Sequence, residues 1–283
     1  GVLMAVALVI FWVGRRRYVL RRPSGPNPHG FFRVVGRALR RLGTGRPGQP
    51  WLDGARDRHP AGAVEGARAV YRILGIFAPI VAFWSLFFQY GSSWVLQAEK
   101  MERAVLGYQV KPSQMGSLEA VFVLLVIPVF AGWLYPFLRR RGLEVTALRR
   151  MGAGMFVAVL SFAWAAGIQL AIDGGGRPHV GWQVPAYLLL AVGEVLISVT
   201  ALEFAYTQAP ASMKSVIMSL WYLTIAGGSL LTATVAKLNR FHGAGYFVFF
   251  ALLMLAGAVA FVAVARRYRP VEFMPAEDEA EAA

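Results

Sequence analysis

Long apolar runs separated by short polar or basic segments dominate the pattern of this chain. The runs cover 2–13, 70–94, 117–138, 151–172, 182–206, 213–235 and 246–264. Each of the last six is long enough to cross a bilayer as a helix, since about 20 helical residues span the hydrocarbon core. The pattern therefore predicts an all-α membrane protein with about seven transmembrane helices.

The first run, 1–14, is shorter than the others and ends at Arg15-Arg16-Arg17. A cleaved signal peptide fits poorly, because its positive charge should precede its apolar core. We expect instead the end of a transmembrane helix whose start has been cut away. Residues 15–69 are rich in Pro, Gly and Arg and show little periodicity, which predicts a basic flexible linker. Such a linker could also contact anionic lipid headgroups.

Residues 70–268 are expected to form a six-helix transmembrane bundle, followed by an acidic, solvated tail over 269–283. Within the run 117–138, Pro128 predicts a kink and Pro136 the end of the helix. Gly152-Ala153-Gly154 and Gly227-Gly228 are small-residue patches that let helices approach closely.

Composition narrows the class further. The chain is 57% hydrophobic with a mean hydropathy of +0.52, which excludes an ordinary soluble domain. The net charge of +14 raises the question of a nucleic-acid partner. Alternating the spans, however, places 23 of the 29 Lys and Arg residues on one membrane face and 6 on the other. This asymmetry supports a multi-pass protein with linker and C-terminus in the cytoplasm, and it argues against a nucleic-acid partner. We expect the protein to lie in the plasma (inner) membrane.

Enzymatic chemistry finds no support in the motifs. There is no cysteine, so disulfides, thiol nucleophiles and iron–sulfur ligation are excluded. All four histidines fall in predicted loops, which argues against haem held by membrane histidines. No HExxH, GxSxG or Walker-type phosphate loop occurs. The sequence therefore favours a transporter-like cavity over an enzyme and predicts no metal or cofactor site.

Near its middle, the run 182–206 carries a carboxylate, Glu194. An acid at that depth costs about 2.5–3.5 kcal/mol on insertion scales and is a functional-site candidate by default. Ser198 lies four residues on and shares its helical face, which predicts a polar cavity lining. The alternative is that Glu194 merely hydrogen-bonds a neighbouring helix. Glu119 is expected near the outer end of its span, within reach of water. A solvated acid at the start of a helix is at least as good an explanation for it as a role in the site.

Three motifs extend this pattern into a family resemblance. They are Gly193-Glu194-x-x-x-Ser198 with Ala201-Leu202-Glu203-Phe204-x-Tyr206-x-Gln208-Ala209-Pro210-x-Ser212-Met213-Lys214-Ser215; Phe83-Trp84-x-Leu86-Phe87-x-Gln89-x-Gly91-Ser92-x-Trp94-x-Leu96-Gln97-Ala98; and Arg149-Arg150-Met151-x-x-Gly154-Met155. Together they cover almost the whole chain in order. The sequence resembles the proton-dependent oligopeptide transporter (POT) family of the major facilitator superfamily.

The resemblance implies the end of helix six plus helices seven to twelve of a twelve-helix fold. The chain would then be the C-terminal six-helix bundle, working with an N-terminal bundle of the same protein. The implied activity is proton-coupled symport of di- and tripeptides, in which two halves rock around a substrate near the midplane. Protons would be the coupling ion, with no other cofactor.

The same resemblance assigns residues. Glu194 corresponds to the acid that meets the amino end of the peptide and pairs with a lysine of the other half. Ser198 corresponds to a polar pocket residue and Trp221 to a tryptophan that shapes the side-chain space. Trp84 and Gln89 correspond to cavity-lining positions.

The motif around the cytoplasmic turn assigns gating or turn positions to Glu203, Gln208 and Lys214. Two departures from the family pattern stand out. Phe88 occupies a place where the family commonly has an acid, and Glu119 one where it often has Asn. The family's E-x-x-E-R motif, tied to proton coupling, is not in this chain, so coupling is inferred from the resemblance alone.

Two alternatives stay open at this stage. One is a transporter of the same family that carries a non-peptide solute such as nitrate, although Glu194 does not favour an anion. The other is a non-transporting membrane scaffold subunit, in which Glu194 and Trp221 would pack against fixed neighbours.

Overall fold

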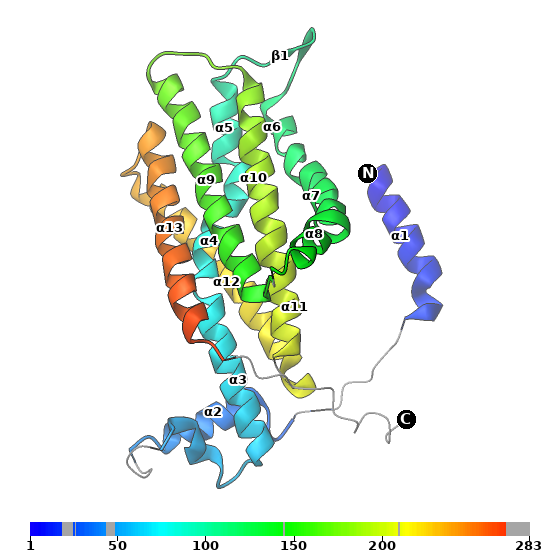
Figure 1. The fold of residues 1–283 in the computed structure, drawn as a ribbon, viewed down its shortest axis with the longest axis vertical. Coiled ribbons are helices and arrows are strands. Elements are labelled where there is room, and N and C mark those ends of the chain that lie inside the picture. Colours follow the sequence, from blue (N-terminus) through cyan, green and yellow to red (C-terminus); the bar gives the residue numbers. More distant parts are fainter. Residues whose placement is uncertain (19–24, 26, 44–48, 144, 209, 270–283) are drawn as a thin grey trace.

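The computed structural model describes residues 1–18, 25, 27–43, 49–143, 145–208 and 210–269. These residues form helices and one short antiparallel β-hairpin (Figure 1). The helices are α1 (Val2–Gly14), α2 (Phe31–Arg40), α3 (Ala61–Phe77), α4 (Ile80–Phe87), α5 (Ser93–Glu99), α6 (Pro112–Met115), α7 (Ser117–Val129), α8 (Tyr135–Arg140), α9 (Ala147–Asp173), α10 (Val184–Glu194), α11 (Thr200–Thr207), α12 (Lys214–Leu238) and α13 (Gly243–Arg267). The hairpin pairs β1 (Ala104–Val105) with β2 (Tyr108–Gln109).

Five continuous helical stretches of the described chain are long and apolar enough to cross a membrane. They are Pro112–Arg140, Ala147–Asp173, Val180–Thr207, Lys214–Leu238 and Gly243–Arg267. Ala61–Phe77 and Ile80–Glu99, bent by 48° at the break between them, make a sixth if they are counted together. This confirms the all-α multi-pass membrane class. The first predicted run corresponds to α1, which has 13 residues and is too short to count as a span.

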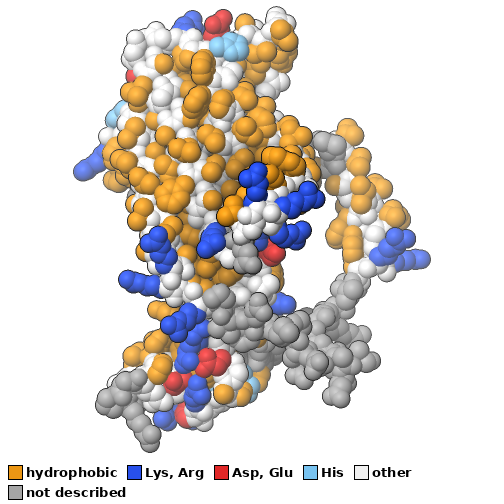
Figure 2. All heavy atoms as spheres, in the orientation of Figure 1, with side chains coloured by type: hydrophobic (Ala, Val, Ile, Leu, Met, Phe, Trp, Pro, Cys, Tyr) orange, Lys and Arg blue, Asp and Glu red, His pale blue; other side chains and the backbone are white. Residues whose placement is uncertain are grey.

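The surface matches this assignment. Apolar side chains cover the sides of the bundle in Figure 2, whereas Lys and Arg gather toward the end that carries α2. Among the exposed apolar residues are Leu124 on α7, Leu160 on α9 and Leu252 on α13. Exposed leucines on long helices are expected where acyl chains, rather than water, surround the protein.

The predicted flexible linker over 15–69 contains ordered helical structure. Helix α2 buries Val34 and Ala38, and a short 3₁₀ segment, Trp51–Ala55, packs against it. Helix α3 begins at Ala61, nine residues before the predicted start of the bundle at 70. The low overall hydropathy of this region gave no sign of its few apolar positions. They are enough to order the region because they pack onto α3 and do not have to form a core alone.

Ion pairs hold this region together. Asp57 pairs with Arg37 of α2 and with Arg41, the residue that follows α2. Asp53 pairs with Arg56 at 2.7 Å and with Arg68 of α3 at 2.8 Å. We call these residues, together with Glu65, which contacts Arg56 and Arg68, the linker ion-pair network. These three acids pair with four of the linker arginines, so the linker keeps a net positive charge.

Two glycines permit close contacts between helices of the bundle. A Cβ at Gly228 of α12 would lie 2.5 Å from Cβ of Trp84 on α4. A Cβ at Gly154 of α9 would lie 2.8 Å from Cβ of Leu196 and 3.0 Å from the carbonyl oxygen of Gly193. The 2.5 Å and 2.8 Å distances are shorter than side chains tolerate. The prediction that these small-residue patches allow close helix approach is confirmed at these two positions.

The span that contains α7 is irregular. Pro128 lies inside α7, and a π-helical turn, Phe130–Leu134, begins two residues later. The prediction that Pro136 ends the helix is wrong, because α8 continues through it to Arg140. Pro136 sits in the first turn of α8, where a missing backbone N–H is tolerated.

Buried amides tie the ends of three helices together near the β-hairpin. Nε2 of Gln97 donates to the carbonyl oxygen of Ala165 and to Oε1 of Gln169, both at 3.0 Å. Nε2 of Gln183 donates to the carbonyl oxygen of Trp94 at 3.0 Å and to Oε1 of Gln97 at 3.1 Å. Because buried amides are costly unless bonded, this network fixes α5, α9 and the start of the α10 span relative to one another.

Candidate binding site

Glu194 is the last residue of α10, and a π-helical turn over Val195–Val199 follows it directly before α11 continues the span. The acid therefore lies inside the continuous stretch Val180–Thr207. π-helical turns inside α-helices are rare and occur frequently at functional sites. Here the π-helical turn widens the helix directly after Glu194.

A second acid faces Glu194 from the neighbouring helix. Helix α7 packs against α10, and the side chains of Glu119 and Glu194 lie close enough to interact electrostatically. Glu119 is only 6% exposed, and its Oε1 has no hydrogen-bond partner. The expectation that Glu119 is open to water is therefore wrong. The packing of α7 on α10 turns the Glu119 side chain into the bundle. We call Glu119 and Glu194 the acid pair.

Tyr90 completes this cluster from the 3₁₀ turn that follows α4. Its phenol group is close enough to interact electrostatically with both Glu119 and Glu194. Its backbone carbonyl accepts a hydrogen bond from the Tyr187 hydroxyl of α10 at 3.2 Å, which anchors the turn. Sequence reasoning missed Tyr90 as a site residue, since an aromatic in an aromatic-rich span gives no distinguishing signal.

The acid pair has no basic partner among the described residues. No Lys, Arg or His side chain of the described residues forms an ion pair with Glu119 or Glu194. Two carboxylates in contact repel each other when both are ionised, and burial strengthens the repulsion. The arrangement is therefore suited to receive a cationic group or a proton.

An aromatic wall lies on the other helices of the site. The rings of Trp84 on α4 and Trp221 on α12 meet edge to face with centroids 5.6 Å apart. Phe77 contacts Trp221 at 5.2 Å, and Phe88 stacks on Trp84 at 5.6 Å. Both tryptophans are buried, and Nε1 of Trp84 has no hydrogen-bond partner. An unused indole N–H is available as a donor to a bound polar group.

The two remaining predicted pocket residues differ. Oγ of Ser198 is buried without a hydrogen-bond partner, which leaves a free hydroxyl one turn from Glu194. Gln89 is buried too, but its polar atoms are used locally. Its Nε2 donates to the carbonyl oxygen of Ser85 at 2.8 Å, and its Oε1 accepts from Oγ of Ser93 at 3.0 Å. The structure thus gives Gln89 a role in shaping the break after α4.

The predicted turn residues lie at the far end of the same span. Oε2 of Glu203 is 3.8 Å from the Arg150 guanidinium of α9. Oε1 of Gln208 accepts a hydrogen bond from the Tyr268 hydroxyl at 3.3 Å. The Lys214 ammonium lies 5.9 Å from the centroid of the Tyr206 ring. These contacts join the turn between α11 and α12 to α9 and to the end of α13, and do not reach the acid pair.

Comparisons with known proteins agree with this architecture. The model of the POT family (PTR2) matches residues 1–244. Peptide transporter 3 of Caenorhabditis elegans is 36% identical over 178 residues, which cover 61% of this chain and 25% of that protein. Solute carrier family 15 member 1 of Homo sapiens is 31% identical over 176 residues, or 60% of this chain and 25% of that protein. The chain spans about a quarter of the length of these relatives.

Solved structures give the same result. An auto inhibited POT family peptide transporter is 36% identical, with a TM-score of 0.80 over 98% of this chain and 65% of its own. The POT family transporter PepTSo is 35% identical, with a TM-score of 0.80 over 95% of this chain and 64% of its own. Since the family model covers most of the sequence and the fold agrees, the chain belongs to the POT family.

Proposed function

We propose that this chain forms the C-terminal bundle of a proton-coupled symporter that takes up di- and tripeptides by alternating access. The relatives named above are peptide transporters or carriers of the same family, which supports this assignment. The activity requires a second six-helix bundle of the same protein, because substrate sites in this superfamily lie between two rocking halves.

The acid pair is the observation that carries the proposal. Glu119 and Glu194 place two carboxyl groups together inside the membrane with no basic partner among the described residues. The free amino group of a short peptide is the cation that such a site would bind. A nitrate ion, in contrast, would be repelled, so the acid pair disfavours the anion-transport alternative.

The rest of the site suits the rest of a peptide. The face formed by Trp84 and Trp221 would accept apolar side chains, and the unused Trp84 N–H and Ser198 hydroxyl would bond peptide carbonyl oxygens. The peptide carboxylate needs a cation, and no transmembrane run of this sequence has Lys or Arg near its middle. We infer that the second bundle supplies it.

Protons are the coupling ion in this proposal, and no other cofactor takes part. The acid pair can hold a proton when peptide is absent and exchange it for the ammonium group when peptide binds. The protein would lie in the plasma membrane, and the excess of Lys and Arg on one face supports an orientation with the linker and C-terminus in the cytoplasm.

Proteoliposomes that contain the full-length protein carrying this chain test the proposal. Uptake of dipeptides, tripeptides and nitrate is measured with and without an inward proton gradient. We expect gradient-driven accumulation of the peptides and none of nitrate. Nitrate accumulation, or peptide uptake that ignores the gradient, would contradict the proposal. No uptake together with a partner that copurifies in stoichiometric amounts would favour the scaffold alternative.

A further inference from the structure

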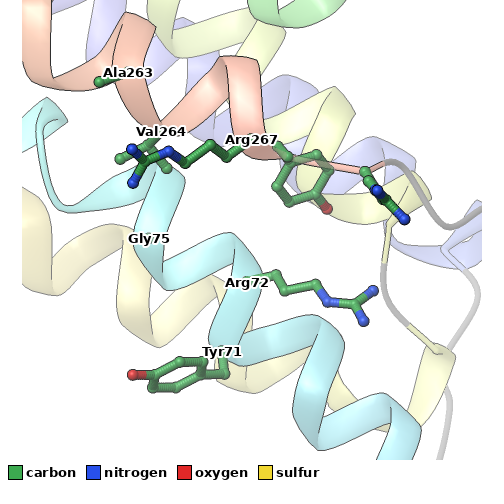
Figure 3. Close-up of a pocket in the computed structure, with 8 residues that line it drawn as sticks. Tyr71, Arg72, Gly75, Ala263, Val264 and Arg267 are labelled. Atoms are coloured by element: carbon green, nitrogen blue, oxygen red, sulfur yellow. The ribbon is translucent and has the colours of Figure 1, made fainter.

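A cationic pocket lies between α3 and α13, outside the candidate binding site. Tyr71 and Arg72 come from α3, and Arg267, Tyr268 and Arg269 come from the end of α13 and the residues after it. The cavity measures about 420 Å³. In Figure 3 the Arg72 side chain extends from α3, while that of Arg267 runs along α13 beside Val264. We call these residues the arginine pocket.

The floor of the arginine pocket is apolar. Gly75, Ala263 and Val264 lie about one turn deeper along α3 and α13. A Cβ at Gly75 would lie 3.8 Å from Val264 Cγ1, so the two helices leave room there without touching tightly. Cationic groups and small apolar groups that line one pocket match a ligand with an anionic head and an apolar body.

No acid of the described residues compensates the charge of this pocket. Arg72, Arg267 and Arg269 form no ion pair with any residue that the structure describes. Arginines of the neighbouring linker ion-pair network behave differently, since Arg37 and Arg68 each bind an acid. Three unpaired guanidinium groups around one concavity favour an external anion.

The pocket also lies at a membrane boundary. Arg267 ends the span Gly243–Arg267, and Tyr268 follows it. Tyrosines are enriched where apolar and aqueous layers meet, and Tyr71 and Tyr268 flank the arginines here. Basic pockets between transmembrane helices on the cytoplasmic side are suited to anionic lipid headgroups.

We propose that the arginine pocket binds the phosphate of an anionic phospholipid headgroup, with one acyl chain along Gly75 and Val264. The planar guanidinium group of Arg72 would bond two phosphate oxygens, and Arg267 and Arg269 would add positive charge around the headgroup. Because the Tyr268 hydroxyl also bonds Gln208, the bound lipid would lie next to the turn between α11 and α12. This site is independent of the proposed peptide site.

Native mass spectrometry of the full-length protein tests this. The protein is purified from vesicles of phosphatidylglycerol and phosphatidylcholine, and retained lipid is counted. We expect selective retention of phosphatidylglycerol. Arg72→Gln with Arg267→Gln should weaken it roughly tenfold to thirtyfold, since each nearby cation adds about fivefold to binding of an anionic surface. Arg72→Lys with Arg267→Lys should keep most of it, which separates lost charge from misfolding.

The matched control removes the same charge elsewhere on the same membrane face. Arg140→Gln with Arg141→Gln changes two exposed arginines at and after the end of α8 and should leave retention unchanged. The proposal would be overturned if both double Arg→Gln variants lost phosphatidylglycerol equally, or if the unmodified protein retained phosphatidylglycerol and phosphatidylcholine equally.

Two further results would also overturn it. One is binding of inorganic phosphate without retained lipid, which would indicate a site for a free anion. The other is phosphatidylglycerol retained only after removal of 270–283, because the acidic tail would then be the competing ligand of the pocket.

Discussion

The molecule uses its acids in two contrasting ways. Asp53, Asp57 and Glu65 of the linker ion-pair network each pair with two arginines at the water-exposed end of the bundle. Glu119 and Glu194, which form the acid pair, lie among apolar helices and face each other. The same side-chain chemistry thus appears once with its countercharge built in and once without it.

The difference separates structure from function. A paired surface acid stabilises a fold a little and needs nothing further. An unpaired acid at membrane depth costs free energy that folding must offset, and such costs persist at sites that bind something. The contrast supports the proposal that the acid pair binds a ligand, whereas the linker ion-pair network joins α2 and the 3₁₀ segment to α3.

The strongest test removes one acid from each region. Glu194→Gln in the full-length protein should abolish dipeptide accumulation while membrane expression is retained, because the amide cannot attract the peptide ammonium. Glu65→Gln is the matched control and should transport normally. Radiolabelled dipeptide uptake into proteoliposomes measures both. Normal uptake by the Glu194→Gln variant would remove Glu194 from the site.

The second test asks whether Glu119 belongs with Glu194. Glu119→Asn should raise the half-saturating dipeptide concentration by about tenfold, the effect expected when one charged hydrogen bond is lost. It should also shift the pH profile of uptake, since one acid of the pair is gone. Transport kinetics at several pH values provide the measurement. Unchanged kinetics and an unchanged profile would make Glu119 a packing residue.

The third test concerns the aromatic wall, which carries no charge. Trp221→Ala should change the ranking among dipeptides of different bulk, because the ring that meets Trp84 and Phe77 is lost. Trp221→Phe, which keeps a smaller ring, should change it less. Competition of unlabelled dipeptides against one labelled peptide gives the ranking. An intact ranking in both variants would contradict a pocket role.

The smallest effect is expected in the linker ion-pair network. The hydrogen bond from Arg37 lowers the pKa of Asp57, outweighing desolvation, which raises it. The contribution of Asp57 to stability is therefore present above its unfolded pKa of about 3.9 and is lost as pH falls through the folded value. Asp57→Asn should lower the melting temperature slightly at pH 7, and the difference should vanish at low pH. Thermal unfolding across pH would disprove this if the difference grew on acidification.

Helix assignments show how far sequence patterns reach. Length and hydropathy located the spans around Glu194 and Trp221, because a bilayer imposes a minimum apolar length on any helix. The same pattern placed the start of α3 too late and treated 15–69 as unstructured. A few apolar residues on α2 decide that region through docking, and a local window does not see the surface onto which they dock.

The candidate site divides in the same way. Depth singled out Glu194, and the family motifs singled out Trp221, Trp84 and Ser198. The contact between Glu119 and Glu194 and the presence of Tyr90 beside them were not foreseeable, since these residues lie far apart in sequence. Gln89 illustrates the converse, because its position suggested a cavity and its hydrogen bonds turned out to be local.

By itself, the sequence determined that this chain is helical and membrane-embedded, that it resembles the POT family, and that one acid lies deep in the bilayer. Those properties follow from composition, run length and local motifs. Only the tertiary structure decided that a second acid turns inward against the first and that, among the described residues, three arginines stay unpaired around a pocket. Helix packing sets which side chains meet, and residues from separate helices acquire their partners only when the bundle closes.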